Sequence, residues 1–217
     1  GGQLSLLMLI ERLEVSGIRV VSANTDGIEM LIPWGYDGIA DSILDWWQKK
    51  TQLVLEGDNY LALYSRDVNS YLAVKTDGKT KGKGVLGAPG LNKAPDAEIV
   101  ADAVTALITK GTPVGTTIRE CRDIRKFVYV QSVTGGATKG GLYLGKVIRW
   151  YYPQGEVGPI LKIKSGDKVP GSDGGRPVMD LPDTFPDDVD YERYEMEANK
   201  LLHAIDYYKR PKAVSLL

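Results

Sequence analysis

The chain has 217 residues with 27 basic and 28 acidic side chains, a formal net charge of −1, which excludes a global electrostatic attraction to nucleic acid or membranes. Its longest apolar run, Leu6 to Ile10, is far shorter than the roughly 18 residues of a membrane span, so no membrane partner is expected. The single Cys121 cannot form an internal disulfide, which favours a reducing, cytoplasmic compartment. Because the chain opens Gly1-Gly2-Gln3 without Met, we expect a piece of a longer protein.

The first part of the chain predicts helices that alternate with short strands. Apolar residues at helical spacing indicate the helices, and runs rich in Ile and Val, bounded by turn-forming residues, indicate the strands. The expected elements are a helix at 3–16, hairpin strands at 18–22 and 27–32 with a tip at 23–26, a helix at 36–51, and strands at 52–64 and 67–75 followed by a turn at 76–79. Together they predict one antiparallel sheet with helices on one side.

Gly and Pro accumulate between residues 84 and 95, which indicates a subdomain boundary. The expected elements beyond it are a helix at 96–110, strands at 123–133 and 142–152 flanking turns at 135–136 and 140–141, and a last helix at 191–207 whose start is favoured by preceding acids. The predicted fold class is α+β, with an antiparallel sheet and packed helices followed by a mixed helical and β region. The predicted domains are residues 1–90 and residues 91–217.

Asp26 stands at the predicted turn between two apolar strands. A tight turn fixes such a carboxylate while its side chain projects off the end of the sheet, where a large polyanion can approach. Phosphoryl transfer by two metal ions needs carboxylates held in this way. Asp is also a common turn former that bonds its own backbone, and the turn alone favours that structural interpretation.

The wider context resembles family B DNA polymerases around their third palm motif, usually written Tyr-x-Asp-Thr-Asp-Ser. The corresponding run here is Ser22-Ala23-Asn24-Thr25-Asp26-Gly27-Ile28, which is similar to a divergent form found among bacteriophage polymerases. The resemblance implies that Asp26 is the catalytic, metal-binding carboxylate and that Asn24 and Thr25 support the turn. Because Asn24 is neutral and replaces the first Asp of the motif, it would hold a metal poorly.

Tyr71 and the lysines around it form a second matching block. Residues 67–84 resemble the family's Lys-x-Tyr element and the Lys-Gly pair that follows it, although Asn69 stands where the family usually has Lys. In that family this strand pair tracks the primer-template duplex. The DNA-binding residues expected here are Tyr71, Lys75, Lys79, Lys81 and Lys83.

The residue types of this block also favour DNA binding without reference to the family. The lysines alternate with small residues, and Gly78, Gly82 and Gly84 would let a backbone approach phosphate closely. The alternative is that alternating lysines protect an exposed edge strand against aggregation.

Two other groups of residues have ordinary structural interpretations. Trp46 and Trp47 are expected in the core and at its rim, rather than stacked on bases. An acidic cluster could bind a cation, but a solvated face is the usual interpretation. Its members are Asp180, Asp183, Asp187, Asp188 and Asp190.

The resemblance implies the end of the palm and a thumb-like, DNA-gripping region of a phage-type DNA-directed DNA polymerase, a nucleotidyltransferase of DNA replication. Such an enzyme adds deoxynucleoside triphosphates to the primer 3′-hydroxyl of primer-template DNA with two Mg²⁺ ions, here in the cytoplasm of an infected bacterial cell. The partner Asp and the fingers helix are expected in an N-terminal remainder, in cis or in trans. Since one carboxylate cannot hold two metals, we expect the isolated chain to be inactive.

Alternatives stay open at this point. The chain could be an accessory half of a split polymerase, or a non-catalytic nucleic-acid-binding module in which Asn24 reflects lost metal chemistry. A reverse transcriptase is a weaker alternative, because such enzymes usually carry two adjacent Asp at the turn and Thr25-Asp26-Gly27 does not.

Overall fold

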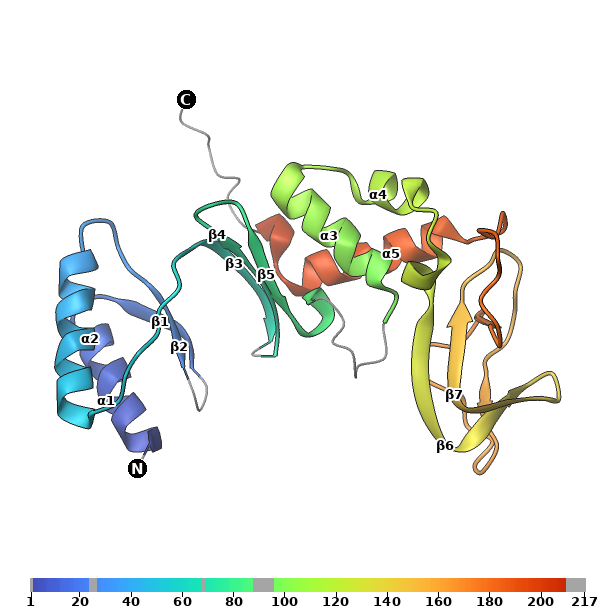
Figure 1. Ribbon diagram of the computed structural model, residues 1–217, viewed down its shortest axis with the longest axis horizontal. Coiled ribbons are helices and arrows are strands. Elements are labelled where there is room, and N and C mark those ends of the chain that lie inside the picture. The colour runs from blue at the N-terminus through green and yellow to red at the C-terminus, as the bar shows by residue number, and fades with distance from the viewer. Residues whose placement is uncertain (1, 24–26, 68, 88–95, 210–217) are drawn as a thin grey trace. The chain divides into compact units, whose positions relative to one another are not determined.

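The computed structural model describes residues 2–23, 27–67, 69–87 and 96–209, and it is shown in Figure 1. The chain divides into two compact units, Gly1–Asn59 and Tyr60–Leu217, which we call unit 1 and unit 2. This division differs from the predicted palm and thumb boundary at residue 90. That boundary falls among residues 88–95, outside the described part of the chain, and stays a prediction.

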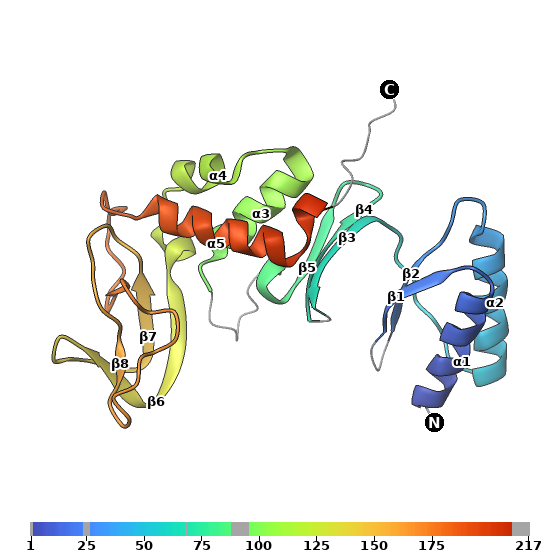
Figure 2. The same cartoon turned by 180° about the vertical axis from the view of Figure 1, so that it is seen from behind.

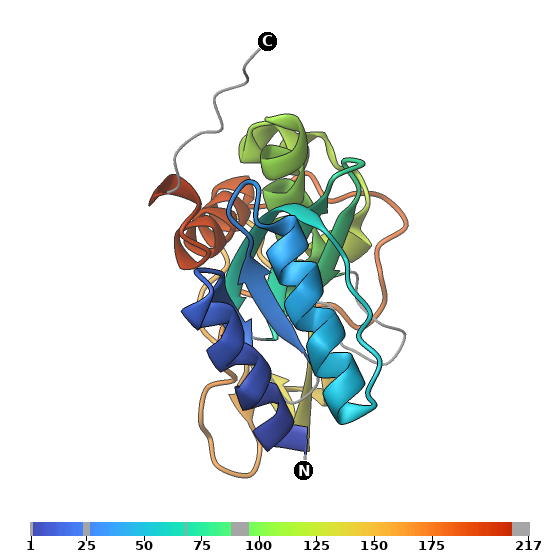
Figure 3. The ribbon, with the colours of Figure 1, turned by 90° about the vertical axis from the view of Figure 1, so that its left-hand side faces the viewer.

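Unit 1 is a helix, a hairpin and a second helix, as the apolar spacing predicts. Its elements are α1 (Gly2–Val15), β1 (Arg19–Ala23), β2 (Ile28–Leu31) and α2 (Asp37–Thr51). Figure 3 shows α1 and α2 side by side against the hairpin. Its buried core consists of Leu9, Leu13, Ile18, Ala40, Ile43 and Trp47.

The two adjacent tryptophans have the structural places expected for them. Trp47 is buried and donates from Nε1 to the Ser5 carbonyl oxygen at 2.5 Å, which ties α2 to α1. Trp46 is half-buried, and the Arg12 guanidinium lies 4.0 Å from the centre of its ring. The core and rim interpretation is therefore confirmed.

Unit 2 begins with a three-stranded antiparallel sheet of order β3-β4-β5. Its strands are β3 (Tyr60–Asp67), β4 (Ser70–Lys75) and β5 (Thr80–Lys83), followed by the 3-10 turn η1 (Gly84–Leu86). The strand predicted from residue 52 begins only at Tyr60, because Gln52 caps α2 in the left-handed conformation and the polar run 56–59 favours an irregular connection.

The prediction of one antiparallel sheet is wrong. The β1-β2 pair forms its own two-stranded sheet, and β3, β4 and β5 form another, in the part of the chain that the structure describes. Alternating apolar residues predict strands, but they do not specify which strands share hydrogen bonds.

Three α-helices pack together in unit 2. They are α3 (Glu98–Lys110), α4 (Val114–Glu120) and α5 (Tyr191–Ala204), with the 3-10 turns η2 (Ile124–Phe127) and η3 (Tyr207–Lys209). Figures 1 and 2 agree that α3 and α5 lie side by side. The sequence did not predict α4, which is short and carries Gly115 and two threonines. The Asp190 side chain accepts from the Arg193 N–H at 3.2 Å, so an acid caps α5 as predicted.

The second sheet of unit 2 has the order β8-β6-β7-β9. Its strands are β6 (Tyr129–Lys139), β7 (Leu142–Tyr151), β8 (Leu161–Lys162) and β9 (Arg176–Pro177), and Figure 2 shows β8 beside β6. The predicted turn at Gly140-Gly141 is confirmed. The predicted turn at Gly135-Gly136 is wrong, because these residues lie inside β6, where the register with β7 shifts.

Tyr194 joins the helices of unit 2 to this sheet. Its ring is fully buried, and its hydroxyl donates to the Phe127 carbonyl oxygen at 2.7 Å and accepts from the Tyr152 N–H at 2.9 Å. Burial raises the pKa of the phenol, so the hydroxyl keeps its proton as a donor.

The protein is an α+β structure with antiparallel sheets and, among its described residues, five α-helices. Over the described residues, no helix has the length and apolar content needed to cross a membrane.

Candidate nucleic-acid interface

The hairpin that carries the predicted catalytic residue is present up to its tip. Strands β1 and β2 pair antiparallel, and the Ala23 and Ile28 pair is the last before the connection. Asn24, Thr25 and Asp26 themselves lie outside the described residues, so their predicted roles stay predictions.

The described residues offer no ready metal centre beside this hairpin. Among them, no group of three or more His, Cys, Asp or Glu side chains could hold a metal ion. Two members of the acidic cluster have other partners: Asp188 accepts from Arg176 Nη1 at 2.6 Å, and Asp190 caps α5. The Mg²⁺ site expected at Asp26 stays a prediction.

The second predicted block gathers on one face of the β3-β4-β5 sheet. Tyr71 pairs with Lys83 across β4 and β5, and Ala73 pairs with Lys81. Directly paired residues of antiparallel strands project to the same face, and residues two apart along a strand share it. The register thus places Tyr71, Lys75, Lys81 and Lys83 on one face, which we call the lysine face.

The opposite face of the same sheet belongs to the core of unit 2. Leu72 is 1% exposed, and Tyr64, which pairs with it from β3, packs against the core and the Tyr207 ring. On the lysine face, Lys81 and Lys83 are exposed and Tyr71 is half-buried. One face thus anchors the sheet, and the other presents cations and a phenol ring.

Lys79 stands apart from the lysine face, in the turn between β4 and β5. Its N–H donates to Asp77 Oδ1 at 2.9 Å, and its Nζ lies 3.4 Å from Asp77 Oδ2. The turn is closed by Gly78 N donating to the Lys75 carbonyl oxygen at 3.0 Å. Lys79 is therefore a turn residue with an exposed, paired side chain, and strand register does not align it with the other lysines.

The glycines of this block serve the chain's own folding. A Cβ on Gly82 would overlap the Leu86 carbonyl oxygen, because η1 folds back over β5. A Cβ on Gly84 would overlap the Asn69 carbonyl oxygen and the Ser70 hydroxyl. The expectation that Gly82 and Gly84 make room for phosphate is corrected: the space beside them is filled by protein.

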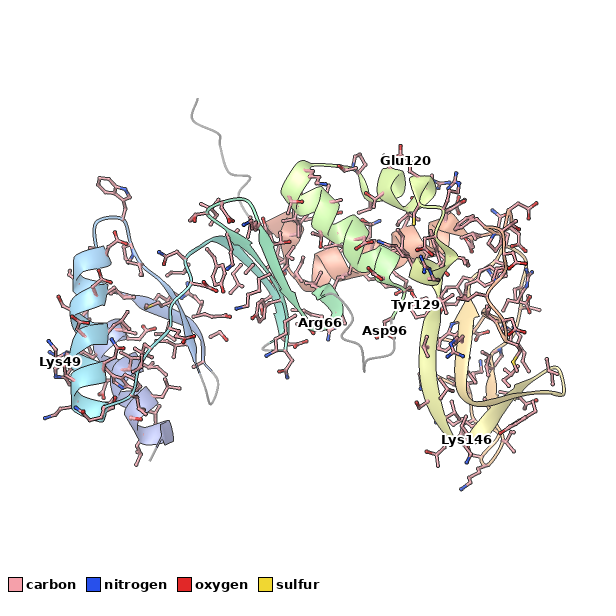
Figure 4. All side chains as sticks on the ribbon, in the orientation of Figure 1. Lys49, Arg66, Asp96, Glu120, Tyr129 and Lys146 are labelled. Carbon is pink, nitrogen blue, oxygen red and sulfur yellow. The ribbon has the colours of Figure 1, made fainter. Side chains whose placement is uncertain are left out.

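Sequence reasoning missed Arg66, which Figure 4 labels at the end of this sheet. Its Nε donates to Asp67 Oδ2 at 2.8 Å and its Nη2 to Ser70 Oγ at 3.3 Å, so the β3 to β4 turn holds the guanidinium. The Arg66 hydrogen bond lowers the pKa of the exposed Asp67 carboxyl. Arg66 follows Ser65, the β3 partner of Tyr71, and bonds Ser70, so it lies at the turn and strand register does not place it on the lysine face.

Strand order leaves two interpretations of the lysines. β5 is the edge strand of its sheet, where lysines discourage pairing with other chains. The same edge position gives a polyanion free approach to Lys81 and Lys83.

In comparisons with known proteins, no protein-family model and no curated protein matches the chain.

Proposed function

We propose that this chain is the C-terminal part of a phage-type family B DNA polymerase, with the lysine face holding primer-template duplex and Asp26 holding Mg²⁺. The observation that carries the proposal is the shared face of Tyr71, Lys81 and Lys83, because the DNA-binding block implied by the resemblance assembles there through strand register. Residues scattered over the two faces would have spoken against it.

Charge and reach suit this surface to a nucleic-acid backbone. Lys81 and Lys83 lie two residues apart on β5, about 7 Å along the strand, and their flexible stems can adjust to successive phosphates of one nucleic-acid strand. A phenol ring beside them can pack on a sugar or donate to a phosphate oxygen. Contacts of this kind position a duplex without reading its sequence, as a replicative polymerase requires.

The catalytic part of the proposal rests on the hairpin. When bound, Mg²⁺ supplies charge stabilisation to phosphoryl transfer. Asp26 is the residue of this chain that would hold it, and the partner carboxylate and the fingers would come from an N-terminal remainder. The isolated chain is accordingly expected to show no Mg²⁺-dependent primer extension.

An Asp26→Asn variant of the complete polymerase tests this assignment. We expect the rate of primer extension to fall by on the order of 1,000-fold, because a metal contributes several kcal/mol of charge stabilisation, while duplex affinity is kept. Asp41→Asn, at an exposed acid of α2, is the matched control and should leave the rate unchanged.

The second candidate is a nucleic-acid-binding module without catalysis, and Asn24 in place of the motif's first Asp favours it. A near-normal extension rate in the Asp26→Asn polymerase would support this candidate. Robust synthesis by the isolated chain would contradict the need for an N-terminal remainder.

A further inference from the structure

The sheet β8-β6-β7-β9 carries a second concentration of positive charge. No acidic residue occurs from Ile124 to Gly155, although the whole chain is nearly neutral. Three of its basic residues, Arg125, Lys126 and Lys139, pair with carboxylates, and the other two, Lys146 and Arg149, lie on β7. Because β7 carries these two cations and no acid, it creates a local field for anions that net charge conceals.

A bulge in β6 concentrates part of this charge. Ser132 pairs with Val147 and Ala137 pairs with Gly145, so residues 133–136 of β6 stand opposite the single β7 residue Lys146. Bulges of this kind bend a strand and re-aim side chains. Figure 4 labels Lys146 where the β6-β7 hairpin bends, away from α3 and α5.

Two further side chains are seated on the glycines of the bulge. A Cβ on Gly135 would lie 2.7 Å from Lys164 Cγ, and a Cβ on Gly136 would lie 2.6 Å from Tyr143 Cε2. Because Gly135 and Gly136 have no side chain, there is room for the aliphatic part of Lys164 and for the ring of Tyr143.

A third lysine comes from the neighbouring strand. Lys162 of β8 pairs with Ala137, directly after the bulge. Strand β7, strand β8 and the turn after β8 therefore bring Tyr143, Lys146, Lys162 and Lys164 around one bulge, which we call the bulge surface.

These side chains are presented outward. Tyr143 is 55% exposed although its ring rests on Gly136, and Lys146 and Lys164 are exposed. Among the described residues, no carboxylate forms an ion pair with the three lysines of the bulge surface. Lys139 differs, because its Nζ lies 2.9 Å from Glu156 Oε1 and its side chain is only 14% exposed.

We propose that the bulge surface binds single-stranded nucleic acid, with Tyr143 stacked on a base and the lysines on phosphates. A fixed aromatic ring accepts any base that is not already stacked, and cations beside it follow the backbone without reading sequence. A duplex offers the phosphates but not the base face. This assignment concerns a different sheet from the lysine face and does not depend on polymerase activity.

The test is fluorescence anisotropy of the full 217-residue chain with a labelled thymidine oligonucleotide and, separately, a blunt duplex. Replacing Lys146, Lys162 and Lys164 by Gln should weaken single-strand binding by on the order of 100-fold near 0.1 M salt and flatten the log–log salt dependence by about 2. Gln at Lys49, Lys50 and Lys110, three exposed lysines of helices, is the matched control. Far-ultraviolet circular dichroism verifies folding of every variant.

Substitutions of Tyr143 distinguish base stacking from attraction between lysines and phosphates. Tyr143→Leu should lower single-strand affinity on the order of tenfold with duplex affinity unchanged, while Tyr143→Phe keeps the ring and the affinity. Equal losses for duplex and single strand, or an unchanged affinity in Tyr143→Leu, would overturn the proposal. Loss of duplex binding on changing the lysine face would leave these results untouched, so the two assignments fail separately.

Discussion

Lys139 and the lysine face show two different surroundings for lysines in unit 2. In β8-β6-β7-β9, Lys139 bonds Glu156 and the Gly175 carbonyl oxygen, and Glu156 in turn accepts from Arg176 Nε at 3.1 Å. In β3-β4-β5, Lys81 and Lys83 lie exposed on an edge strand whose other face holds the core. A buried cation held by partners stabilises the fold, whereas exposed cations on an outer face can meet a ligand. Burial, rather than lysine content, distinguishes Lys139 from Lys81 and Lys83.

The largest expected effect concerns the glycine beneath η1. Gly82→Ala should lower the free energy of unfolding of unit 2 by about 3 kcal/mol, because the new methyl group meets backbone that cannot rotate away. Urea denaturation measures it. Gly57→Ala, where the added Cβ has nothing within 4 Å, is the control. An unchanged stability of Gly82→Ala would contradict the close packing of η1 on β5.

The enclosed cations of the second sheet provide the next test. Glu156→Gln should destabilise unit 2 by about 2 kcal/mol at neutral pH, because it leaves the nearly buried Lys139 without this counter-ion and removes one of the two carboxylates beside the partly exposed Arg176. Thermal or urea unfolding of both proteins at neutral pH measures the difference.

The stabilisation by Glu156 should also depend on pH. Hydrogen bonds from Lys139 and Arg176 lower the pKa of Glu156, so its stabilisation is complete above the ordinary glutamate pKa and is lost as the pH falls through the lowered value. The stability difference between the wild type and Glu156→Gln should shrink over that acidic range. A difference independent of pH would contradict the ion-pair account.

The smallest effect separates the turn lysine from the lysine face. Lys79→Gln should change duplex affinity less than Lys81→Gln, because Lys79 lies in the turn with its charge beside Asp77. Its exposed ion pair should add no more than about 0.5 kcal/mol to stability. Equal losses of duplex affinity from the two variants would extend the binding surface to the turn, as the sequence predicts for Lys79.

The sequence predicted much of the local structure and little of the pairing between distant strands. Apolar spacing located α1 and α2 within a residue or two, because helix periodicity is a local property. The start of β3, the separation of the two N-terminal sheets and the bulge at Gly135 depend on tertiary contacts that no local pattern contains.

The candidate site was predictable in the same uneven way. The lysine and tyrosine positions could be named from sequence, and the structure aligns Tyr71, Lys75, Lys81 and Lys83 by register. Sequence reasoning could not foresee that Lys79 lies apart from the lysine face or that η1 needs Gly82. Both depend on how the chain turns before and after β5.

The most direct test of the central proposal is the salt dependence of duplex DNA binding by the wild type, a Lys81→Gln/Lys83→Gln variant and a Lys49→Gln/Lys50→Gln control. Loss of two phosphate contacts predicts a log–log slope shallower by about 1.8 and an affinity lower by on the order of 60-fold near 0.1 M salt, in the first variant alone. The same slope and affinity in all three proteins would show that the lysines guard an edge strand and that the lysine face does not hold DNA.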